Sequence, residues 1–164
     1  MSLSQLNGKT YLIRTFGCQM NMHDSERVSG LLDSCGCMEV ATPEEADIVV
    51  FMTCCVREAA DTRLYGQCLS CKSLPAPPSG KRVIAVGGCI AQRDGEGLLT
   101  NLDNVDVVFG THSIAHVGDL IAQAFDDGNH HVRCEEHEEN PATTMPWHRA
   151  TSYHAWVPIM TGCN

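Results

Sequence analysis

The sequence predicts an α/β protein in which a doubly wound parallel sheet of about five strands carries helices on both faces. Three observations predict this fold. Short runs rich in β-branched residues alternate with longer segments that suit helices. The run at 47–52 is apolar on both of its faces, as a strand in the middle of a parallel sheet is. At 164 residues, the chain is long enough for one well-packed domain.

Each element has a local justification. The first strand, 10–16, is rich in β-formers, and Asn21 caps a helix that runs to about Ser34 and is ended by Gly36. Prolines and a glycine at 75–80 break the chain before the next strand. The expected strands are 10–16, 37–40, 47–52, 82–86 and 105–109, and the expected helices are 21–34, 57–72, 95–101 and 113–125. This alternation is typical of flavodoxin-like folds, so we expect the strand order 2-1-3-4-5.

Composition divides the chain into four parts. Residues 1–9 are expected to be an N-terminal extension or the remnant of a tag, and residues 10–125 form the α/β domain. Residues 126–150 are polar and acidic without clear periodicity, which indicates a linker, and its tract of His and Cys at 130–137 is interpreted as solvated. Residues 151–164 turn apolar again and are expected to open a second domain whose remainder is absent.

Charge and hydropathy exclude several functions. The net charge is −9 without a basic stripe, so we expect no strong nucleic-acid binding by this chain alone. No run approaches the roughly 18 apolar residues of a membrane span, and the first residues are unlike a secretory signal. We therefore expect a cytoplasmic protein without membrane contact. Ten cysteines in that reducing setting favour metal, cluster or redox roles over disulfides.

Three of the cysteines are placed alike. Cys18, Cys54 and Cys89 each follow a predicted strand, at intervals of 36 and 35 residues. In the expected strand order those strands are adjacent, and their carboxyl ends share the edge where α/β sheets bind ligands. Three thiolate ligands would leave the fourth position of a zinc ion or an iron–sulfur cluster open, which is typical of a reactive site. The alternative is three buried cysteines that only pack.

Other residues near this edge have expected supporting roles. Gly17, Gly87 and Gly88 permit close approach of the backbone to a metal group, where their amides can hydrogen-bond to sulfur. Asn21 and Arg57 lie close enough in the sequence to help position partners.

The remaining cysteines are weaker candidates. Cys55 adjoins Cys54 and could replace it, but neighbouring side chains diverge, so a single ligand is expected there. Cys68 and Cys71 share one face of a predicted helix, where packing is the favoured interpretation. Cys35 and Cys37 flank a helix end without an obvious partner.

Several motifs between residue 10 and residue 164 form a recognisable series. They are Gly17-Cys18-Gln19-Met20-Asn21, Asp24-Ser25-Glu26, Thr53-Cys54 with Val56-Arg57-Glu58, Gly87-Gly88-Cys89-Ile90-Ala91-Gln92-Arg93, and the stretch 154–164. In order and spacing they closely resemble the amino-terminal domain of radical S-adenosylmethionine methylthiotransferases, and the first motif is similar to the MiaB-type branch that modifies transfer RNA. Two positions depart from the family pattern. Met52 stands where the family usually has Asn, and Cys55 stands where Ser or Ala is common.

The resemblance implies a function. Cys18, Cys54 and Cys89 would hold an auxiliary 4Fe–4S cluster with one iron open to receive sulfur. Cys163 would be the first ligand of a second 4Fe–4S cluster that cleaves S-adenosylmethionine, its other ligands lying beyond this chain. The complete enzyme would insert a methylthio group at carbon 2 of N6-isopentenyladenosine beside the anticodon. Transfer RNA would be bound through the missing domains, proteins that donate sulfur and electrons would be partners, and this fragment alone would be inactive.

Rival interpretations stay open on the sequence. Within the family, the substrate could be threonylcarbamoyl-adenosine in transfer RNA or a ribosomal protein. In a different class, the chain could be a non-catalytic zinc or electron-transfer module. A flavin site is disfavoured, because residues 16–21 lack the hydroxyl-rich phosphate loop expected at the first strand–helix turn.

Overall fold

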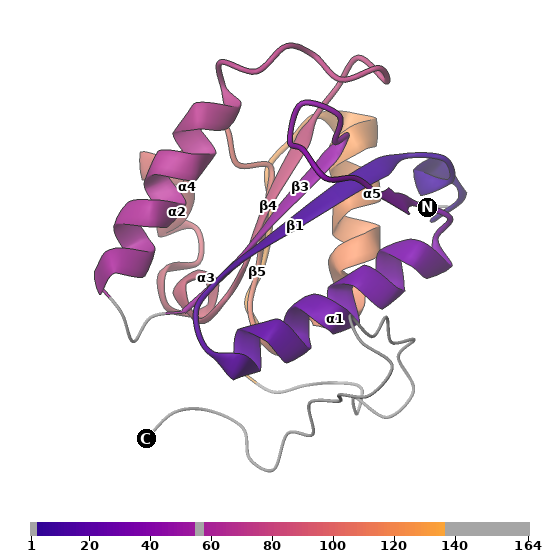
Figure 1. Ribbon diagram of the computed structural model, residues 1–164. Coiled ribbons are helices and arrows are strands. Elements are labelled where there is room, and N and C mark those ends of the chain that lie inside the picture. The colour runs from indigo at the N-terminus through magenta and orange to yellow at the C-terminus, as the bar shows by residue number, and fades with distance from the viewer. Residues whose placement is uncertain (1–2, 55–57, 137–164) are drawn as a thin grey trace.

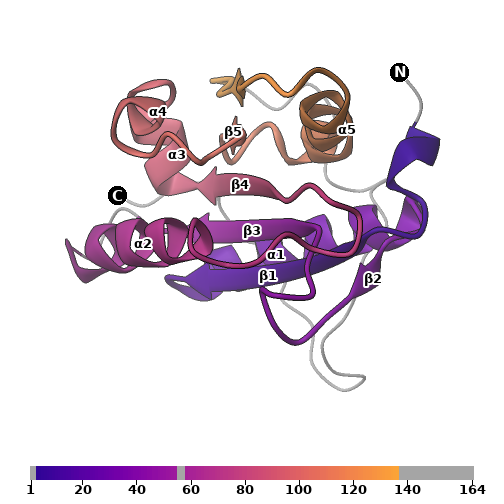
Figure 2. The same cartoon turned by 90° about the horizontal axis from the view of Figure 1, so that it is seen from above.

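The computed structural model describes residues 3–54 and 58–136, which form one parallel sheet with helices on both faces. The strands are β1 (Thr10–Phe16), β2 (Met38–Glu39), β3 (Ile48–Thr53), β4 (Val83–Gly88), β5 (Val107–Phe109) and β6 (His131–Arg133). The helices are α1 (Gln19–Ser34), α2 (Glu58–Cys71), α3 (Cys89–Asp94), α4 (Gly97–Asn101) and α5 (Val117–Asp127), with 3-10 turns at Leu3–Leu6 and Ile114–His116. The strand order is β2-β1-β3-β4-β5-β6, and Figure 2 shows β1, β3, β4 and β5 stacked in that sequence. The doubly wound α/β fold and the expected order of the first five strands are confirmed.

The two faces of the sheet have separate cores. Helices α1 and α5 cover one face, and α2, α3 and α4 cover the other (Figure 1). Successive side chains of a strand point to opposite faces, so Ile48, Val50 and Met52 pack under α1 and α5, while Val49 and Phe51 pack under α2. Every residue of β3 is buried for this reason, and its sequence is apolar up to Thr53, its last residue.

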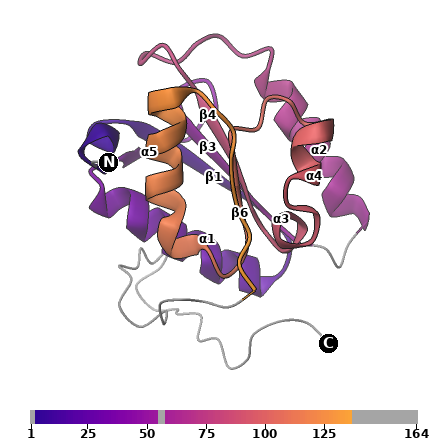
Figure 3. The same cartoon turned by 180° about the vertical axis from the view of Figure 1, so that it is seen from behind.

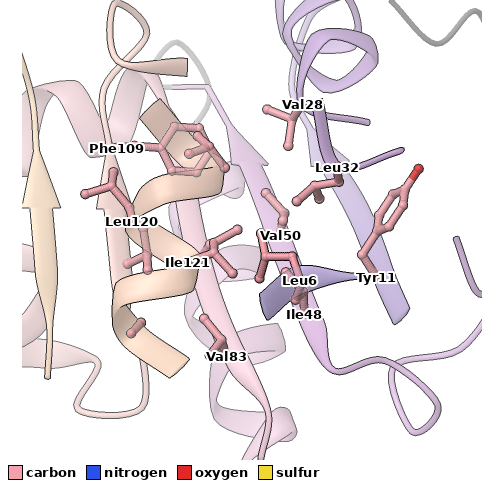
Figure 4. Close-up of a cluster of buried hydrophobic side chains, with 14 of the residues drawn as sticks. Leu6, Tyr11, Val28, Leu32, Ile48, Val50, Val83, Phe109, Leu120 and Ile121 are labelled. Atoms are coloured by element: carbon pink, nitrogen blue, oxygen red, sulfur yellow. The ribbon is translucent and has the colours of Figure 1, made fainter. Parts of the chain in front are cut away.

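The core under α1 and α5 includes the N-terminal turn of the chain. Val28 and Leu32 of α1 and Leu120 and Ile121 of α5 meet the sheet in this cluster (Figure 4). Leu6 is fully buried in the same cluster. Leu6 therefore packs with the α/β domain, although it lies in the segment 1–9 that was expected to be an extension or a tag remnant. The two leucines of this segment, Leu3 and Leu6, are too few to form a periodic pattern that would have indicated this.

Two helices begin earlier than the sequence predicted. α1 begins at Gln19, and Cys18 is its N-cap, where Asn21 was expected to be the cap. Asn21 is the third helical residue and forms a capping box with Cys18. A helix was expected only over 95–101, whereas α3 begins at Cys89, directly after β4, and α4 follows after a short break.

A sixth strand lies within the segment that was expected to be a linker. β6 pairs in parallel with β5, with His131 opposite Val107 and Arg133 opposite Phe109. β6 is therefore an edge strand of the sheet, next to β5, and it is labelled in Figure 3. Its one apolar residue, Val132, gives no pattern in the sequence, and pairing with the edge of β5 forms the strand. The sheet therefore has six strands where about five were expected.

Over the part of the chain that the structure describes, no helix has both the length and the apolar character needed to cross a bilayer.

Candidate metal centre

The three cysteines singled out by the sequence lie at the carboxyl edge of three adjacent strands. Phe16, the last residue of β1, pairs with Thr53, and Thr53 pairs with Gly88 at the end of β4. Cys54 and Cys89 follow directly after β3 and β4, and Cys18 comes two residues after β1. Neighbouring strands are about 4.8 Å apart, so the three cysteine-bearing loops span roughly 10 Å. The loops gather at the lower end of the sheet in Figure 1, where α1 and α3 begin.

The side chains of these cysteines are not arranged as a metal-ligand set. Cys54 is 2% exposed, whereas Cys18 and Cys89 are half-buried. Across residues 3–54 and 58–136, no three His, Cys, Asp or Glu side chains form a group that could hold a metal ion. The thiol of Cys18 lies 3.5 Å from Asn21 Oδ1 instead. The structure thus brings the three loops together without converging their sulfurs.

Hydrogen bonds from two buried side chains join the three loops. Asn21 Oδ1 accepts from the backbone N–H of Cys18 at 3.2 Å, and Asn21 Nδ2 donates to the carbonyl of Thr53 at 2.8 Å. Thr53 Oγ1 donates in turn to the carbonyl of Gly87 at 2.8 Å. Asn21 is 1% exposed and Thr53 is fully buried. Asn21 is among the predicted supporting residues. Thr53 was expected only as part of the Thr53-Cys54 motif, and its hydroxyl at the end of an otherwise apolar strand is the sequence signal for its role between the loops.

The three glycines named from the sequence are required by close contacts. A Cβ on Gly17 would collide with Asn21 Oδ1 and lie 2.7 Å from Cys54 Cβ. Gly88 has φ +97°, which favours glycine, and a Cβ there would collide with the carbonyl oxygen of Thr53. At Gly87 the space is filled by the ring of Phe109. Gly17 and Gly88 therefore let the cysteine loops approach one another, while Gly87 serves the core.

The other cysteines have structural surroundings. Cys68 and Cys71 are buried among the apolar side chains under α2, and burial raises the pKa of the Cys68 thiol to about 12. A thiol held neutral in this way packs as a small apolar residue, as the favoured interpretation had it. Cys35 caps the far end of α1, and the buried Cys37 thiol donates to the carbonyl of Leu6 at 3.3 Å. Neither lies at the cysteine edge, the carboxyl edge of the sheet where Cys18, Cys54 and Cys89 follow β1, β3 and β4.

Some predicted site residues lie outside the described residues. They are Cys55, Arg57 and Cys163. In the predicted linker tract, His130 Nδ1 lies 2.7 Å from the carbonyl of Val105, and His131 lies 3.0 Å from Asp127. Both imidazoles thus have local partners beside β5 and β6.

After β6, residues 134 and 135 are hydrogen-bonded to α3. Gln92 Nε2 donates to the carbonyl of Glu135 at 3.1 Å, and the thiol of Cys134 donates to the carbonyl of Ala91 at 3.2 Å. Because α3 starts at Cys89, this exit segment is held next to the third cysteine loop.

Together the fold and this edge define a doubly wound α/β domain with three cysteine-bearing loops at the carboxyl ends of adjacent strands. The chain belongs to the Uncharacterized protein family UPF0004, which it matches over residues 10–110.

Curated relatives have more specific names. The chain is 47% identical over 156 residues to the tRNA-2-methylthio-N(6)-dimethylallyladenosine synthase of Mycobacteroides abscessus, which covers 95% of the chain and 31% of that protein. It is 46% identical to the protein of the same name from Mycolicibacterium smegmatis, over 95% of the chain and 30% of the relative. It is 48% identical to the protein of the same name from Acidothermus cellulolyticus, over 95% of the chain and 31% of the relative. The chain therefore spans about 30% of the length of these relatives.

Proposed function

We propose that this chain is the part of a transfer-RNA methylthiotransferase that holds an iron–sulfur cluster on Cys18, Cys54 and Cys89. The observation that supports it most directly is the position of these cysteines at the ends of β1, β3 and β4. The names of relatives 46–48% identical to the chain supply the class of reaction. Because the chain spans about 30% of their length, turnover belongs to a longer protein.

The residues at the cysteine edge fit such a group in their chemistry. Cysteine thiolates are the usual ligands of 4Fe–4S clusters, and three of them leave one iron open. Gly17 and Gly88 present backbone without side chains between the loops. Binding requires the Cys18 thiol to lose its proton to solvent and to give up its contact with Asn21 Oδ1. The bound cluster would supply the open iron at which transferable sulfur is held.

Anaerobic reconstitution of the 164-residue chain with iron and sulfide tests the ligand assignment. We expect about four irons and four sulfides per chain, the content of a cubane cluster, with the visible absorption of iron–sulfur charge transfer. Cys18→Ala, Cys54→Ala and Cys89→Ala should each lose most of this iron. Cys35→Ala, at the opposite end of α1, is the matched control and should load as the parent chain does. Iron uptake that ignores all three substitutions, or uptake of zinc alone by a colourless protein, would contradict the assignment.

In the complete protein, the substrate in this proposal is the N6-dimethylallyl-adenosine of transfer RNA named in its relatives. S-adenosylmethionine and a second 4Fe–4S cluster, with Cys163 as its first ligand, belong to the same proposal. The proposal also includes a cytoplasmic location and partner proteins that donate sulfur and electrons. With a net charge of −9, this chain is unsuited to hold RNA alone, which assigns that contact to the rest of the protein.

Mass analysis of transfer RNA nucleosides tests the substrate. A strain that lacks the gene should lose 2-methylthio-N6-dimethylallyladenosine and accumulate the nucleoside without the methylthio group. The full-length gene should restore it, and a full-length Cys54→Ala variant should not. Loss of the methylthio group from threonylcarbamoyl-adenosine, or from a ribosomal protein, would assign the chain to a sister branch instead.

A further inference from the structure

One buried side chain contacts all three cysteine-bearing loops. Asn21 lies in the first turn of α1 and is 1% exposed. Its Oδ1 accepts from the N–H of Cys18 at 3.2 Å and lies 3.5 Å from Cys18 Sγ, and its Nδ2 donates to the carbonyl of Thr53, next to Cys54, at 2.8 Å. Nδ2 also borders the loop of Cys89, since a Cβ on Gly88 would lie 3.2 Å from it.

The contacts of Asn21 fix the orientation of its amide. The backbone N–H of Cys18 can only donate and the carbonyl of Thr53 can only accept, so the amide has one arrangement that satisfies both. No other uncharged side chain of this size carries a donor and an acceptor at the same branch point. Thr53 Oγ1 continues the connection to the carbonyl of Gly87 in β4.

The packing around Asn21 leaves the loops little freedom to shift. Gly17 lies against Asn21 Oδ1 and Cys54 Cβ so closely that a single added carbon would collide with the oxygen. Gly88 lies in the same way against Thr53. Since protein interiors are close-packed, a side chain in this position transmits any change in its size or bonding to all three loops.

We propose that Asn21 is a positioning residue that holds Cys18 in register with the loops of Cys54 and Cys89, so that stable metal loading at this edge depends on its amide. This inference rests on the proposed function, because it assigns Asn21 a role toward the cluster. It goes beyond the ligand set, since Asn21 itself contacts backbone groups and is not a ligand. Groups that hold metal ligands in place typically change metal affinity by about 10- to 100-fold when they are removed.

The test compares Asn21→Leu and Asn21→Ala with Ser29→Ala in the 164-residue chain. Leu has the same number and branching of side-chain heavy atoms as Asn without its hydrogen bonds, and Ala is the second variant should the larger methyl groups of Leu keep the chain from folding. Ser29 is the matched control because it lies on the same helix, is 7% exposed and shares a buried hydrogen bond of 2.7 Å with Tyr11. Removing its hydroxyl weakens the domain at a site remote from the cysteines.

Three quantities are measured for each variant: the thermal midpoint without metal, the rate of iron loss to a chelator after anaerobic loading, and the alkylation rate of Cys18 in the metal-free chain. We expect the Asn21 variants to lose iron about tenfold faster than the parent, the lower end of the effect of such supporting groups. Cys18 should also be alkylated several-fold faster in them, because its loop is no longer anchored. Ser29→Ala should match the parent in both rates despite a lower midpoint.

The outcomes separate this inference from the proposed function. The Asn21 variants are compared with Ser29→Ala at equal thermal midpoint. If they lose iron and are alkylated at Cys18 no faster than Ser29→Ala, Asn21 has only a structural role and the inference is wrong, while cluster binding stands. If the parent chain takes up no iron, the proposed function fails and the role of Asn21 toward a cluster fails with it. The alkylation rates then still decide whether the amide anchors the Cys18 loop.

Discussion

Replacement of Gly87 by alanine should destabilise the domain through a single overpacked contact. Gly87 of β4 pairs with Phe109 of β5, and the fully buried Phe109 ring lies over it on the α1 and α5 face. A Cβ at Gly87 would collide with two ring carbons and lie 2.8 Å from a third. The ring has no solvent-exposed space to move into, so either the ring or the strand must shift.

The expected cost follows from the balance of two effects. Inserting a carbon into a packed core costs about 1–3 kcal/mol. Replacing glycine by alanine also restricts the unfolded chain, which offsets about 0.4–1 kcal/mol. The net loss of unfolding free energy is therefore about 1–2 kcal/mol, or roughly 5 °C in the thermal midpoint.

Thermal and urea unfolding followed by circular dichroism measure this loss. Gly66→Ala is the matched control, because Gly66 lies in α2 with no heavy atom within 4 Å of an added Cβ. It should be stabilised by about 0.5–1 kcal/mol, the helix preference of alanine over glycine. Adding Phe109→Leu to Gly87→Ala should cost less than the sum of the two single changes, since the smaller side chain makes room. A Gly87→Ala protein as stable as the parent, or strict additivity in the double variant, would refute the overpacking argument.

Two further predictions concern aspartates at the opposite edge of the sheet. Burial raises the pKa of the Asp47 carboxyl, but hydrogen bonds from Ser79 and Thr10 outweigh it and leave the pKa below its usual value. Its ionised form therefore stabilises the domain above about pH 4, and this contribution is lost as the pH falls through the folded-state pKa. Asp47→Asn should lower the thermal midpoint at pH 7, and its difference from the parent should shrink as the pH falls below about 4. Asp106 accepts a hydrogen bond from the N–H of Ile84 at 2.8 Å, and burial raises the pKa of its carboxyl. The contribution of Asp106 to the stability of the domain is therefore present below its unfolded-state pKa and is lost as the pH rises through its folded-state pKa. Asp106→Asn, which can still accept that hydrogen bond, should keep or raise the midpoint at pH 7; a loss there as large as that of Asp47→Asn would contradict the assignment of the two signs.

The elements around the site were predictable because their local patterns agree with their tertiary surroundings. β1 has the expected bounds, 10–16, since its β-formers pair on the side that carries the apolar run of β3. The alternation of strands and helices alone then predicts that Cys18, Cys54 and Cys89 follow strands at one edge of the sheet, where the structure has them.

What the sequence did not reveal depends on contacts between distant segments. β6 contains one apolar residue, Val132, and exists because β5 has an edge to pair with. Asn21 suits an N-cap by its residue type, but the structure places it inside the first turn, where it caps the N–H of Cys18 and also donates to the carbonyl of Thr53, 32 residues away. The arrangement of the three sulfurs likewise depends on side-chain torsions, which the spacing of the cysteines in the sequence does not determine.

The fastening of residues 134 and 135 to α3 has a consequence for whatever follows in the chain. Gln92, three residues from Cys89, donates a hydrogen bond to the carbonyl of Glu135, so the described part of the chain ends close to the cysteine edge. Encounters between the next segment and the cysteine loops are then intramolecular, with an effective concentration set by the length of chain between them. Gln92→Ala would remove one of the two hydrogen bonds that hold this end, the other being that of Cys134 to Ala91, without altering Cys18, Cys54 or Cys89.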